Sequence, residues 1–512
     1  MANKSLFASA LARLLPRADS RNAEGAPAYA YGPEARLAHL AATGTLADTF
    51  YGTAEAQLAD VVAAARAVDP LFVAKAAVYA RRFGAMKDMP ALLAAYLTTI
   101  DPVLAARLFH RVIDSGRMLR TYVQILRSGQ VGRSSLGTRP KRLVQHWLEQ
   151  ATIEDLMAAA TGTAPSLKDI VRMVHPRPAD PERRAFYGWL LDRPYDVAAL
   201  PEPIAAFEAW KPTRDGALPP VPFSWLVGQA LTPDQWGELA LRMGAQALRL
   251  NLNTLARQGA FRVPGVAEAV AARLEAADRA LGQPYQMMMA LKAVGAGVPL
   301  RVQAALETVL ERALAVVPRI EGAVVVCPDV SGSMSSPLTG HRRGATTAVR
   351  CVDVAALIAS ALLRSNPEAR VLPFEHRVVS VRVEATARIA VNAARLAAVG
   401  GGGTNVSAPL VQLERERARV DLIVIVSDNQ SWVDARTDGA TATMRAFRRL
   451  QRRNPGLRLV CIDLQPHGST QAASGADILN VGGFSDAVFE TMARFARGES
   501  RDWVGEIDRM EV

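Results

Sequence analysis

The feature that most constrains the fold is a change in the pattern of apolar residues near Pro318. Before this point, apolar residues recur three and four positions apart in one segment after another, which predicts helices. After it, short apolar segments such as Gly322–Cys327 alternate with helical segments. Strands that alternate with helices are typical of a largely parallel sheet covered on both faces. The sequence therefore predicts an all-helical domain over residues 1–318 and a Rossmann-like α/β domain over residues 319–512.

The first domain is predicted to contain many consecutive helices, separated by short breaks that carry proline or glycine. These helices are expected at residues 34–43, 55–68, 71–83, 90–99, 102–115, 117–127, 141–150, 153–160, 167–174, 181–192, 232–242, 265–281, 285–294 and 299–317. Helices stacked in sequence favour an α-solenoid of the HEAT type, but without a fixed repeat period a non-repetitive helical domain is the alternative. The proline-rich residues 193–223 are predicted to form an internal loop or linker.

The second domain is predicted to consist of alternating strands and helices. Strands are expected at residues 322–327, 370–374, 378–383, 421–426, 457–463 and 478–481, and helices at 346–364, 385–399, 407–418, 440–453 and 485–497. In open sheets of this kind, ligands bind at the carboxyl ends of the strands. The residues that follow the strands are therefore the first place to look for a site.

Oxygen-bearing side chains follow three of these predicted elements. Asp329, Ser331 and Ser333 come directly after the apolar strand GAVVVC, and Asp428 ends the apolar strand DLIVIVSD. Thr404 lies in the glycine-rich loop GGGGTN ahead of a helix. Carboxylates and hydroxyls are hard ligands that suit Mg²⁺, Mn²⁺ or Ca²⁺ better than zinc. The alternative is that the serines and Asp428 only cap helices.

Basic residues gather in two places in the helical domain. The segment 127–143 has no acidic residue, and its basic residues are Arg127, Arg133, Arg139, Lys141 and Arg142. Downstream, Lys168, Arg172 and His175 are predicted to lie along one helical ridge. Such side chains can bind phosphates or bases of a nucleic acid. The alternative is a helix face that only contacts solvent, with a histidine whose hydrogen bonds are made within the protein.

The net charge of the chain indicates what kind of partner it attracts, and its cysteine content indicates the cellular compartment. Lys and Arg number 60 against 49 Asp and Glu, so the chain attracts polyanions unless the excess is incidental. The three cysteines include no CxxC pair, which fits a reducing cytoplasm. The N-terminal residues predict an amphipathic helix rather than a signal peptide, and no apolar run is long enough to predict a membrane span.

The ordered set of Asp329, Ser331, Ser333, Thr404 and Asp428 resembles the metal-ion-dependent adhesion site of von Willebrand factor A domains. The resemblance covers the whole of residues 319–512. It implies that the two serines and the threonine ligate one divalent cation, with Mg²⁺ as the first choice, and that the two aspartates bind it directly or through water. It also implies an open coordination position for a partner's carboxylate.

The motifs of the helical domain resemble the Ro ribonucleoprotein (TROVE) family in the same order. They are Thr43-Gly44-Thr45 with Phe50-Tyr51, the turn Met86-Lys87-Asp88-Met89-Pro90, residues 132–141, the K-D-x-x-R-x-x-H motif at residues 168–175 and Asn251-Leu252-Asn253-Thr254. The resemblance implies a ring of HEAT-like helices whose outer surface binds a small noncoding Y RNA. It also implies that single-stranded 3′ ends of misfolded RNAs enter the central hole.

Several residues acquire expected roles from this resemblance. His175 matches a position important for RNA binding, with Arg172 and Lys168 beside it, and Lys87 lies in a matching turn. Arg249 is expected either to line the hole or to pack at the edge of the core. One segment departs from the family, because residues 156–165 lack the basic residues that relatives carry there. Contact with Y RNA on this ridge is therefore less expected than RNA binding in general.

These observations lead to one main functional hypothesis and one alternative. The main hypothesis is a non-enzymatic, monomeric, cytoplasmic RNA-binding ring that acts in RNA quality control and passes RNAs to an exoribonuclease or another protein docked at the metal site. The alternative is a protein-binding adhesion module on a helical scaffold without an RNA role. A metal-dependent hydrolase is disfavoured, because the ligand set leaves no evident general base and there is no phosphate-binding GxxxxGK[ST] motif.

Overall fold

The structure of the protein is a computed structural model. It describes residues 15–44, 46, 53–84, 86–277, 284–314, 317–338, 349–432, 439–465, 467–483, 487–499 and 503–512. The predicted N-terminal helix, Thr45 and the Phe50-Tyr51 pair lie outside these described residues.

The chain divides into two compact units. One, here called the sheet unit, comprises Met1–Val68, Gln283–Ala293 and Leu310–Met510, and the other, the helical unit, comprises Asp69–Gly282, Val294–Val309 and Glu511–Val512. The division does not coincide with residue 318, because the N-terminal segment Met1–Val68 belongs to the sheet unit. As a boundary between sequence domains, residue 318 stays a prediction.

The sheet unit contains a five-stranded parallel sheet with the strand order β4-β3-β5-β6-β8. Its strands are β3 (Val324–Pro328), β4 (Arg370–Val371), β5 (Leu422–Ser427), β6 (Arg458–Asp463) and β8 (Ile478–Gly482). The three central strands are almost entirely buried apolar runs, which is expected when helices cover both faces. The predicted α/β architecture is confirmed.

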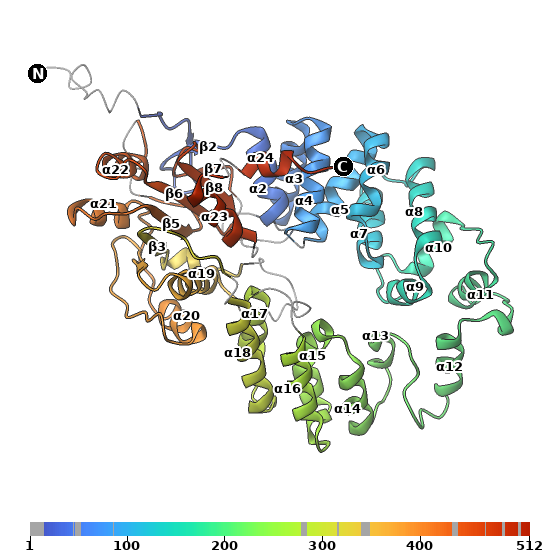
Figure 1. Ribbon diagram of the computed structural model, residues 1–512. Helices are drawn as coiled ribbons and strands as arrows, with labels where there is room; N and C mark the ends of the chain where they lie inside the picture. Colours follow the sequence, from blue (N-terminus) through green and yellow to red (C-terminus); the bar gives the residue numbers. More distant parts are fainter. Residues whose placement is uncertain are drawn as a thin grey trace, which may run out of the picture. The chain divides into compact units, whose positions relative to one another are not determined.

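Helices cover the two faces of this sheet, as Figure 1 shows. One face carries α19 (Cys351–Ser365), which packs on β3 and β5, with α20 (Ile389–Ala397) against it. The other carries α21 (Ala408–Arg415) and α22 (Ala442–Gln451), whose apolar side chains form one core with the strands. The short helix η5 (Gly332–Ser335) follows β3, and α23 (Ala487–Arg497) and α24 (Trp503–Asp508) end the unit.

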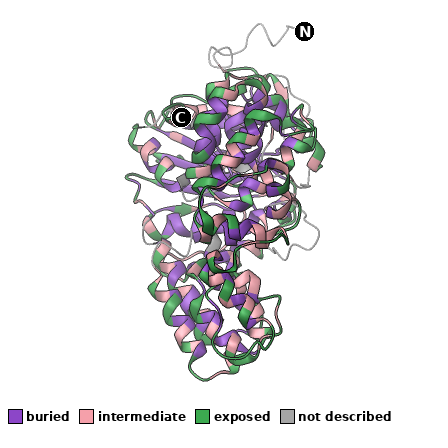
Figure 2. Cartoon of the chain, turned by 90° about the vertical axis from the view of Figure 1, so that its right-hand side faces the viewer, coloured by how far each residue is buried: buried purple, intermediate pink, exposed green. Residues whose placement is uncertain are grey.

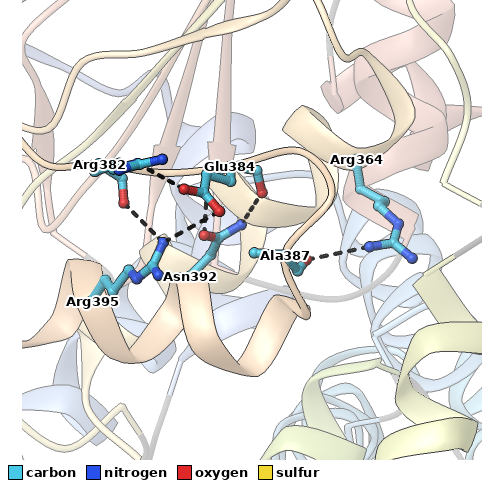
Figure 3. Close-up of polar contacts among 6 residues, drawn as sticks. All are labelled: Arg364, Arg382, Glu384, Ala387, Asn392 and Arg395. Carbon is cyan, nitrogen blue, oxygen red and sulfur yellow. Dashed lines mark hydrogen bonds and ion pairs between the residues drawn. The ribbon is translucent and has the colours of Figure 1, made fainter.

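One predicted strand of this domain is wrong. Residues 378–383 alternate valine with polar residues, yet they form no ladder and make only an isolated bridge between Phe374 and Val378. The valines stay half-exposed. Arg382, within this segment, and Glu384, which directly follows it, form polar contacts with Asn392 and Arg395 of α20 (Figure 3). Alternation alone does not make a strand when no neighbouring strand is available to pair with it.

The N-terminal segment adds two strands that the sequence pattern did not predict to the two helices that it did. Strands β1 (Ser20–Arg21) and β2 (Pro27–Ala30) pair with each other, and β2 also pairs with β7 (Ser469–Thr470). Helix α2 (Pro33–Thr43) packs against β8 and α24, and α3 (Ala54–Arg66) packs on α2. Strands of two and four residues are too short to show periodicity.

The helical unit contains the predicted helices, together with helices at Phe223–Leu226 and Ala245–Arg257 that were not predicted. The helices of this unit are α4 (Pro70–Arg82), α5 (Asp88–Ile100), α6 (Pro102–Val112), α7 (Gly116–Arg127), α8 (Thr138–Gln150), α9 (Ile153–Ala159), α10 (Leu167–Val174), α11 (Pro181–Leu190), η2 (Val197–Ala199), α12 (Glu202–Trp210), α13 (Phe223–Leu226), α14 (Pro233–Arg242), α15 (Ala245–Arg257), η3 (Ala260–Arg262) and α16 (Val266–Ala276). Helices close in sequence pack on one another, as in an α-solenoid. Helices α17 (Pro284–Ala293) and α18 (Leu300–Leu314) precede the sheet.

The proline-rich residues 193–223 are not the simple loop that was predicted, because they contain η2 and α12. The prolines do not prevent α12, since Pro201 is its N-cap and Pro203 lies in its first turn, where no backbone donor is lost. Ile204, Phe207 and Trp210 are spaced three apart and buried. Figure 2 shows buried positions along the packed sides of the helices. No helix in the described part of the chain is long and apolar enough to cross a membrane.

Candidate functional site

The pairing of β3 with β5 brings the two predicted aspartates to the same edge of the sheet. The strands are parallel, and Pro328 is in register with Val426. The Asp329 amide donates a hydrogen bond to the Val426 carbonyl (2.8 Å), so the chain stays attached to β5 as it leaves β3. Asp329 and Asp428 therefore emerge together at the carboxyl ends of adjacent strands, as predicted.

The Asp329 carboxylate is fully buried and held at both oxygens. Its Oδ1 accepts a hydrogen bond from the Ser331 amide (2.8 Å), and its Oδ2 accepts one from the Ser427 hydroxyl (2.5 Å). Burial, together with the charge of Asp428, raises the pKa of Asp329 to about 7. Burial disfavours the charged form unless an opposite charge compensates it. The two hydrogen bonds thus orient a carboxylate that forms no ion pair with a basic side chain in the described part of the chain.

The Asp428 carboxylate is also buried and is only partly satisfied. Its Oδ1 accepts a hydrogen bond from the Gln430 amide (3.4 Å), whereas its Oδ2 has no hydrogen-bond partner within the described part of the chain. Burial raises the pKa of Asp428 to about 6, and a hydrogen bond from the Ser333 hydroxyl acts in the opposite direction. A buried oxygen without a partner costs about 1–3 kcal/mol, which a ligand at this position would offset.

The hydroxyl residues lie on loops that meet at the same place. The Ser331 and Ser333 Oγ atoms are 3.3 Å apart. The Gly332 amide donates to the Gly402 carbonyl (3.0 Å), which joins the loop after β3 to the glycine-rich loop that carries Thr404. Thr404 is buried, and its carbonyl accepts a hydrogen bond from the Trp432 amide (3.3 Å) in the loop after β5. Each of the three loops thus contacts another.

The basic residues predicted to bind RNA are only partly brought together. Lys141 of α8 and His175 at the end of α10 line one pocket of about 590 Å³, together with Arg177 and one acidic residue, Glu149. The Gln145 side chain donates to the Val174 carbonyl (2.6 Å) and so ties α8 to α10 beside this pocket. Arg177 was not among the residues predicted from the sequence, although it lies only two residues after His175.

The predicted ridge of Lys168, Arg172 and His175 needs a correction. Helix α10 ends at Val174, and His175 is its C-cap in the left-handed conformation with φ of 52°. His175 therefore leaves the helical face on which Arg172 lies, and both side chains are exposed. Lys168 forms an ion pair with Asp192, and this pair holds the pKa of Asp192 below its usual range.

The remaining predicted RNA contacts fall into different environments. Arg139 and Arg142 are exposed at the start of α8, and Arg133 is half-buried with its guanidinium against Gly137. Lys87 is exposed, and partial burial followed by the charges of Arg117 and Arg81 lowers its pKa. Arg249 is buried, with 6% of its surface exposed, and burial lowers its pKa. Of its two expected roles, packing within the core fits the structure.

Comparison with known proteins bears first on the sheet unit. Residues 323–496 match the family model described as the Ro60 vWA domain, vWA standing for von Willebrand factor A. This part of the chain is similar to the von Willebrand factor A domain of Ro60 proteins, in agreement with its parallel sheet.

Two individual proteins extend the similarity beyond the von Willebrand factor A domain. The RNA-binding protein RO60 of Deinococcus radiodurans is 28% identical over 218 residues, which is 42% of this chain and 39% of that relative. The aligned segment thus spans less than half of the relative. A crystal structure of the Ro (Rsr) protein of D. radiodurans superimposes with a TM-score of 0.62 and 21% identity, over 92% of this chain and 100% of that one. The chain therefore has the fold of a bacterial Ro protein.

The residues at the edge of the von Willebrand factor A domain fit a hard divalent cation. Asp329, Asp428 and the nearby hydroxyls provide only oxygen donors, and the unpartnered Oδ2 of Asp428 is buried among them. Among the residues that the structure describes, no cluster of three or more His, Cys, Asp and Glu is suited to a metal. The hydroxyls would therefore have to complete any coordination shell, as oxygen-preferring Mg²⁺ or Ca²⁺ allows.

Four residues around this site were missed by sequence reasoning. Ser427 holds Asp329, and Glu375 accepts a hydrogen bond from the Gly402 amide (2.8 Å). Asp463 ends β6 and is fully buried, and burial followed by the charge of Asp428 raises its pKa well above the usual value. Its position at a strand end is the same signal that identified Asp428. Trp432 is 47% exposed, and nothing in its sequence context marks it.

Proposed function

We propose that this chain binds RNA through exposed basic residues of its helical unit. The observation that carries the proposal is the pocket where Lys141 of α8 meets His175 and Arg177 at the end of α10. Lysine and arginine side chains neutralise phosphates, and an imidazole stacks on an unpaired base or donates a hydrogen bond to it. The aligned relative from D. radiodurans is described as an RNA-binding protein, which supports the same function.

The finer form of the proposal concerns the RNAs and their handling. A small noncoding RNA of the Y type binds the outer surface of a ring of helices, and single-stranded 3′ ends of misfolded RNAs enter its central hole. The protein acts as a cytoplasmic monomer in RNA quality control, without an enzymatic activity of its own. The exposed Arg172 and His175 support an RNA contact at α10. The segment 156–165 has no basic residue, so the Y-RNA contact is expected to depend on residues outside it.

A binding experiment with matched RNAs tests this function. The pure protein is titrated with a structured RNA that carries a single-stranded 3′ tail and with its blunt version, each at several salt concentrations. The variants are Arg172→Ala/His175→Ala and Lys141→Ala/Arg177→Ala. Arg382→Ala/Arg415→Ala removes two exposed charges from the sheet unit and is the matched control.

The expected result is binding that prefers the tailed RNA and weakens as salt increases, because phosphate contacts release counterions. The Lys141→Ala/Arg177→Ala variant should lower the slope of log K against log salt by about 1–2, since each lost phosphate contact removes roughly one unit. The control should keep the slope. Binding that ignores the tail and is equal in all three variants would contradict the proposal.

For the sheet unit, we propose that Asp329, Ser331, Ser333, Thr404 and Asp428 hold one divalent cation, with Mg²⁺ expected before Mn²⁺ or Ca²⁺. When bound, the cation would supply a Lewis-acidic position for an acidic side chain of a partner such as an exoribonuclease. The chain's own residues orient the site: Ser427 and the Ser331 amide fix the Asp329 carboxylate, and the Gln430 amide fixes that of Asp428.

A second function, metal-dependent protein binding without an RNA role, is favoured by Trp432. Its backbone is joined to Thr404, and its side chain is half exposed beside the site. Exposed aromatic residues are common anchors in protein interfaces. Asp329→Ala separates the two functions: if RNA binding is kept while a protein partner is lost, the metal site serves proteins and the helical unit serves RNA. Loss of RNA binding in a folded Asp329→Ala protein would contradict this division.

A further inference from the structure

The turn between β1 and β2, residues Asn22–Ala26, is held in one conformation by its own hydrogen bonds. The Asn22 amide donates to the Ala26 carbonyl (2.9 Å), and the Gly25 amide donates to the Asn22 carbonyl (3.0 Å). The Asn22 Oδ1 accepts hydrogen bonds from the Glu24 amide (3.1 Å) and the Ala26 amide (2.9 Å). Gly25 has φ of 75°, which a glycine adopts without strain. The turn is therefore held in place by hydrogen bonds within it.

This turn is bonded to the loop that carries the candidate metal ligand Asp428. The Asn22 Nδ2 donates to the Ser431 carbonyl (2.5 Å), and the Ala23 amide donates to the Gln430 Oε1 (2.7 Å). The Gln430 amide in turn donates to the Asp428 carboxylate. Asn22 and Gln430 are both buried, so water does not compete for these bonds. A continuous series of hydrogen bonds thus leads from the N-terminal turn to the carboxylate.

The turn also places a charge near the site. Glu24 is exposed and directly follows Ala23, whose amide bonds the Gln430 side chain, so a negative charge lies on the turn that contacts the Asp428 loop. Two buried polar atoms on the same loop, Asp428 Oδ2 and Gln430 Nε2, have no hydrogen-bond partner among the described residues. A cation between Asp329 and Asp428 would relieve the repulsion of their buried carboxylates, and a carboxylate on the hydrogen-bonded turn would add to its attraction.

We infer that the N-terminal turn Asn22–Gly25 belongs to the metal centre. Asn22 is a positioning residue that holds the Asp428 loop in the conformation that binds the cation, and the Glu24 carboxylate strengthens the binding electrostatically. The inference rests on the proposed metal site and adds to it a part of the chain far away in sequence. Partners that hold a ligand in place typically change metal affinity by about 10–100-fold when they are removed.

The test measures Mg²⁺ affinity of the full chain by isothermal titration calorimetry, with the melting temperature in excess EDTA as a separate measure of stability. The variants are Asn22→Ala and Glu24→Gln. Asn392→Ala is the control for loss of a buried asparagine, because Asn392 of α20 bonds the Glu384 backbone (Figure 3). Glu34→Gln removes an exposed carboxylate from α2 and is the control for charge.

Asn22→Ala is expected to raise the Mg²⁺ Kd by about tenfold or more, and Asn392→Ala to lower the melting temperature without changing the Kd by more than about twofold. Glu24→Gln is expected to raise the Kd by about threefold at low salt, with a smaller effect at high salt, while Glu34→Gln has none. Glu24→Gln leaves the hydrogen bonds of the turn in place, so it reports on the site even if Asn22→Ala does not fold.

Two outcomes would overturn the inference alone: an unchanged Kd in both Asn22→Ala and Glu24→Gln, or an equal increase in Asn392→Ala. In either case Mg²⁺ still binds the wild-type chain and the proposed metal site stands. A wild-type chain that does not bind Mg²⁺ would overturn the proposed metal site, and the inference with it.

Discussion

At the scale of single residues, the hydrogen bond from Ser427 to Asp329 makes a specific prediction. The Ser427 hydroxyl is buried and orients one oxygen of the carboxylate. Ser427→Ala should therefore raise the Kd for Mg²⁺ by about 10–100-fold, the usual effect of removing a residue that orients a metal ligand. Isothermal titration calorimetry measures this. Ser360→Ala is the matched control, because Ser360 is equally buried and bonds only the Ala356 carbonyl within α19. An unchanged Kd in Ser427→Ala would show that this hydrogen bond does not orient a metal ligand.

A second residue-scale prediction concerns His39 of α2 and acid stability. His39 is buried and stacks on Tyr31 with ring centroids 4.1 Å apart, and burial lowers its pKa from 6.5 to about 3. Because the unfolded chain binds a proton below pH 6.5 and the folded chain does not, the free energy of unfolding falls as the pH drops from 6.5 towards 3. The loss should approach about 1.4 kcal/mol per pH unit in that window.

His39→Phe removes this titration while keeping a ring of similar shape, so its free energy of unfolding should depend less on pH between 6.5 and 4 than that of the wild type. Urea unfolding at several pH values gives the comparison. A pH dependence that is identical in His39→Phe and wild type would exclude His39 as its source.

Sequence reasoning reached some residues of the site and not others, for physical reasons. Asp329 and Asp428 were found because parallel strands end at one edge, and Asp463 obeys the same rule although it was not chosen. Asn22 could not have been found, since its contact with Ser431 joins positions 409 residues apart. His175 was placed on a helical face by spacing, but the helix ends one residue earlier and turns it away.

At the scale of elements, Gly116 determines how closely α7 and α9 pack. A Cβ at Gly116 would lie 2.1 Å from the Ala159 Cβ and 2.6 Å from its Cα, and neither atom belongs to a flexible side chain. Gly116→Ala should therefore force the helices apart and lower the free energy of unfolding by about 1–3 kcal/mol, despite the better helix propensity of alanine. Gly244→Ala is the control, because nothing lies within 4 Å of its Cβ position. Equal stabilities of the two variants in urea unfolding would contradict this packing argument.

The periodicity of apolar residues predicts some helices and strands correctly and others not. Long amphipathic helices such as α7 were predicted within a residue or two, because one face is buried along the whole length. Residues 378–383 have the alternation of a strand but find no partner strand, and α12 forms within a segment whose prolines suggested a loop. In both cases the deciding factor is the surrounding packing, which a local pattern does not contain.

At the scale of the whole molecule, the basic pocket and the candidate metal site belong to different compact units. The pocket of Lys141 and His175 is made by α8 and the end of α10, whereas Asp329 and Asp428 belong to the sheet edge. Coupling between two sites requires a ligand at one to favour a conformation that changes the other. No residue of the described structure belongs to both sites, so the simplest expectation is that the two binding events are independent.

Metal removal tests this expectation. In excess EDTA the protein should lose the stabilisation that bound Mg²⁺ provides, about 2.7 kcal/mol at a concentration one hundred times the Kd, and its melting temperature should fall. The Kd for tailed RNA, measured at constant ionic strength, should change by less than about twofold, and Asp329→Asn should behave like the EDTA-treated wild type in both measurements. Since coupling free energies are reciprocal, saturating RNA should likewise leave the Mg²⁺ Kd unchanged. A joint loss of Mg²⁺ and RNA affinity in a folded Asp329→Asn protein would show that the two units act as one site.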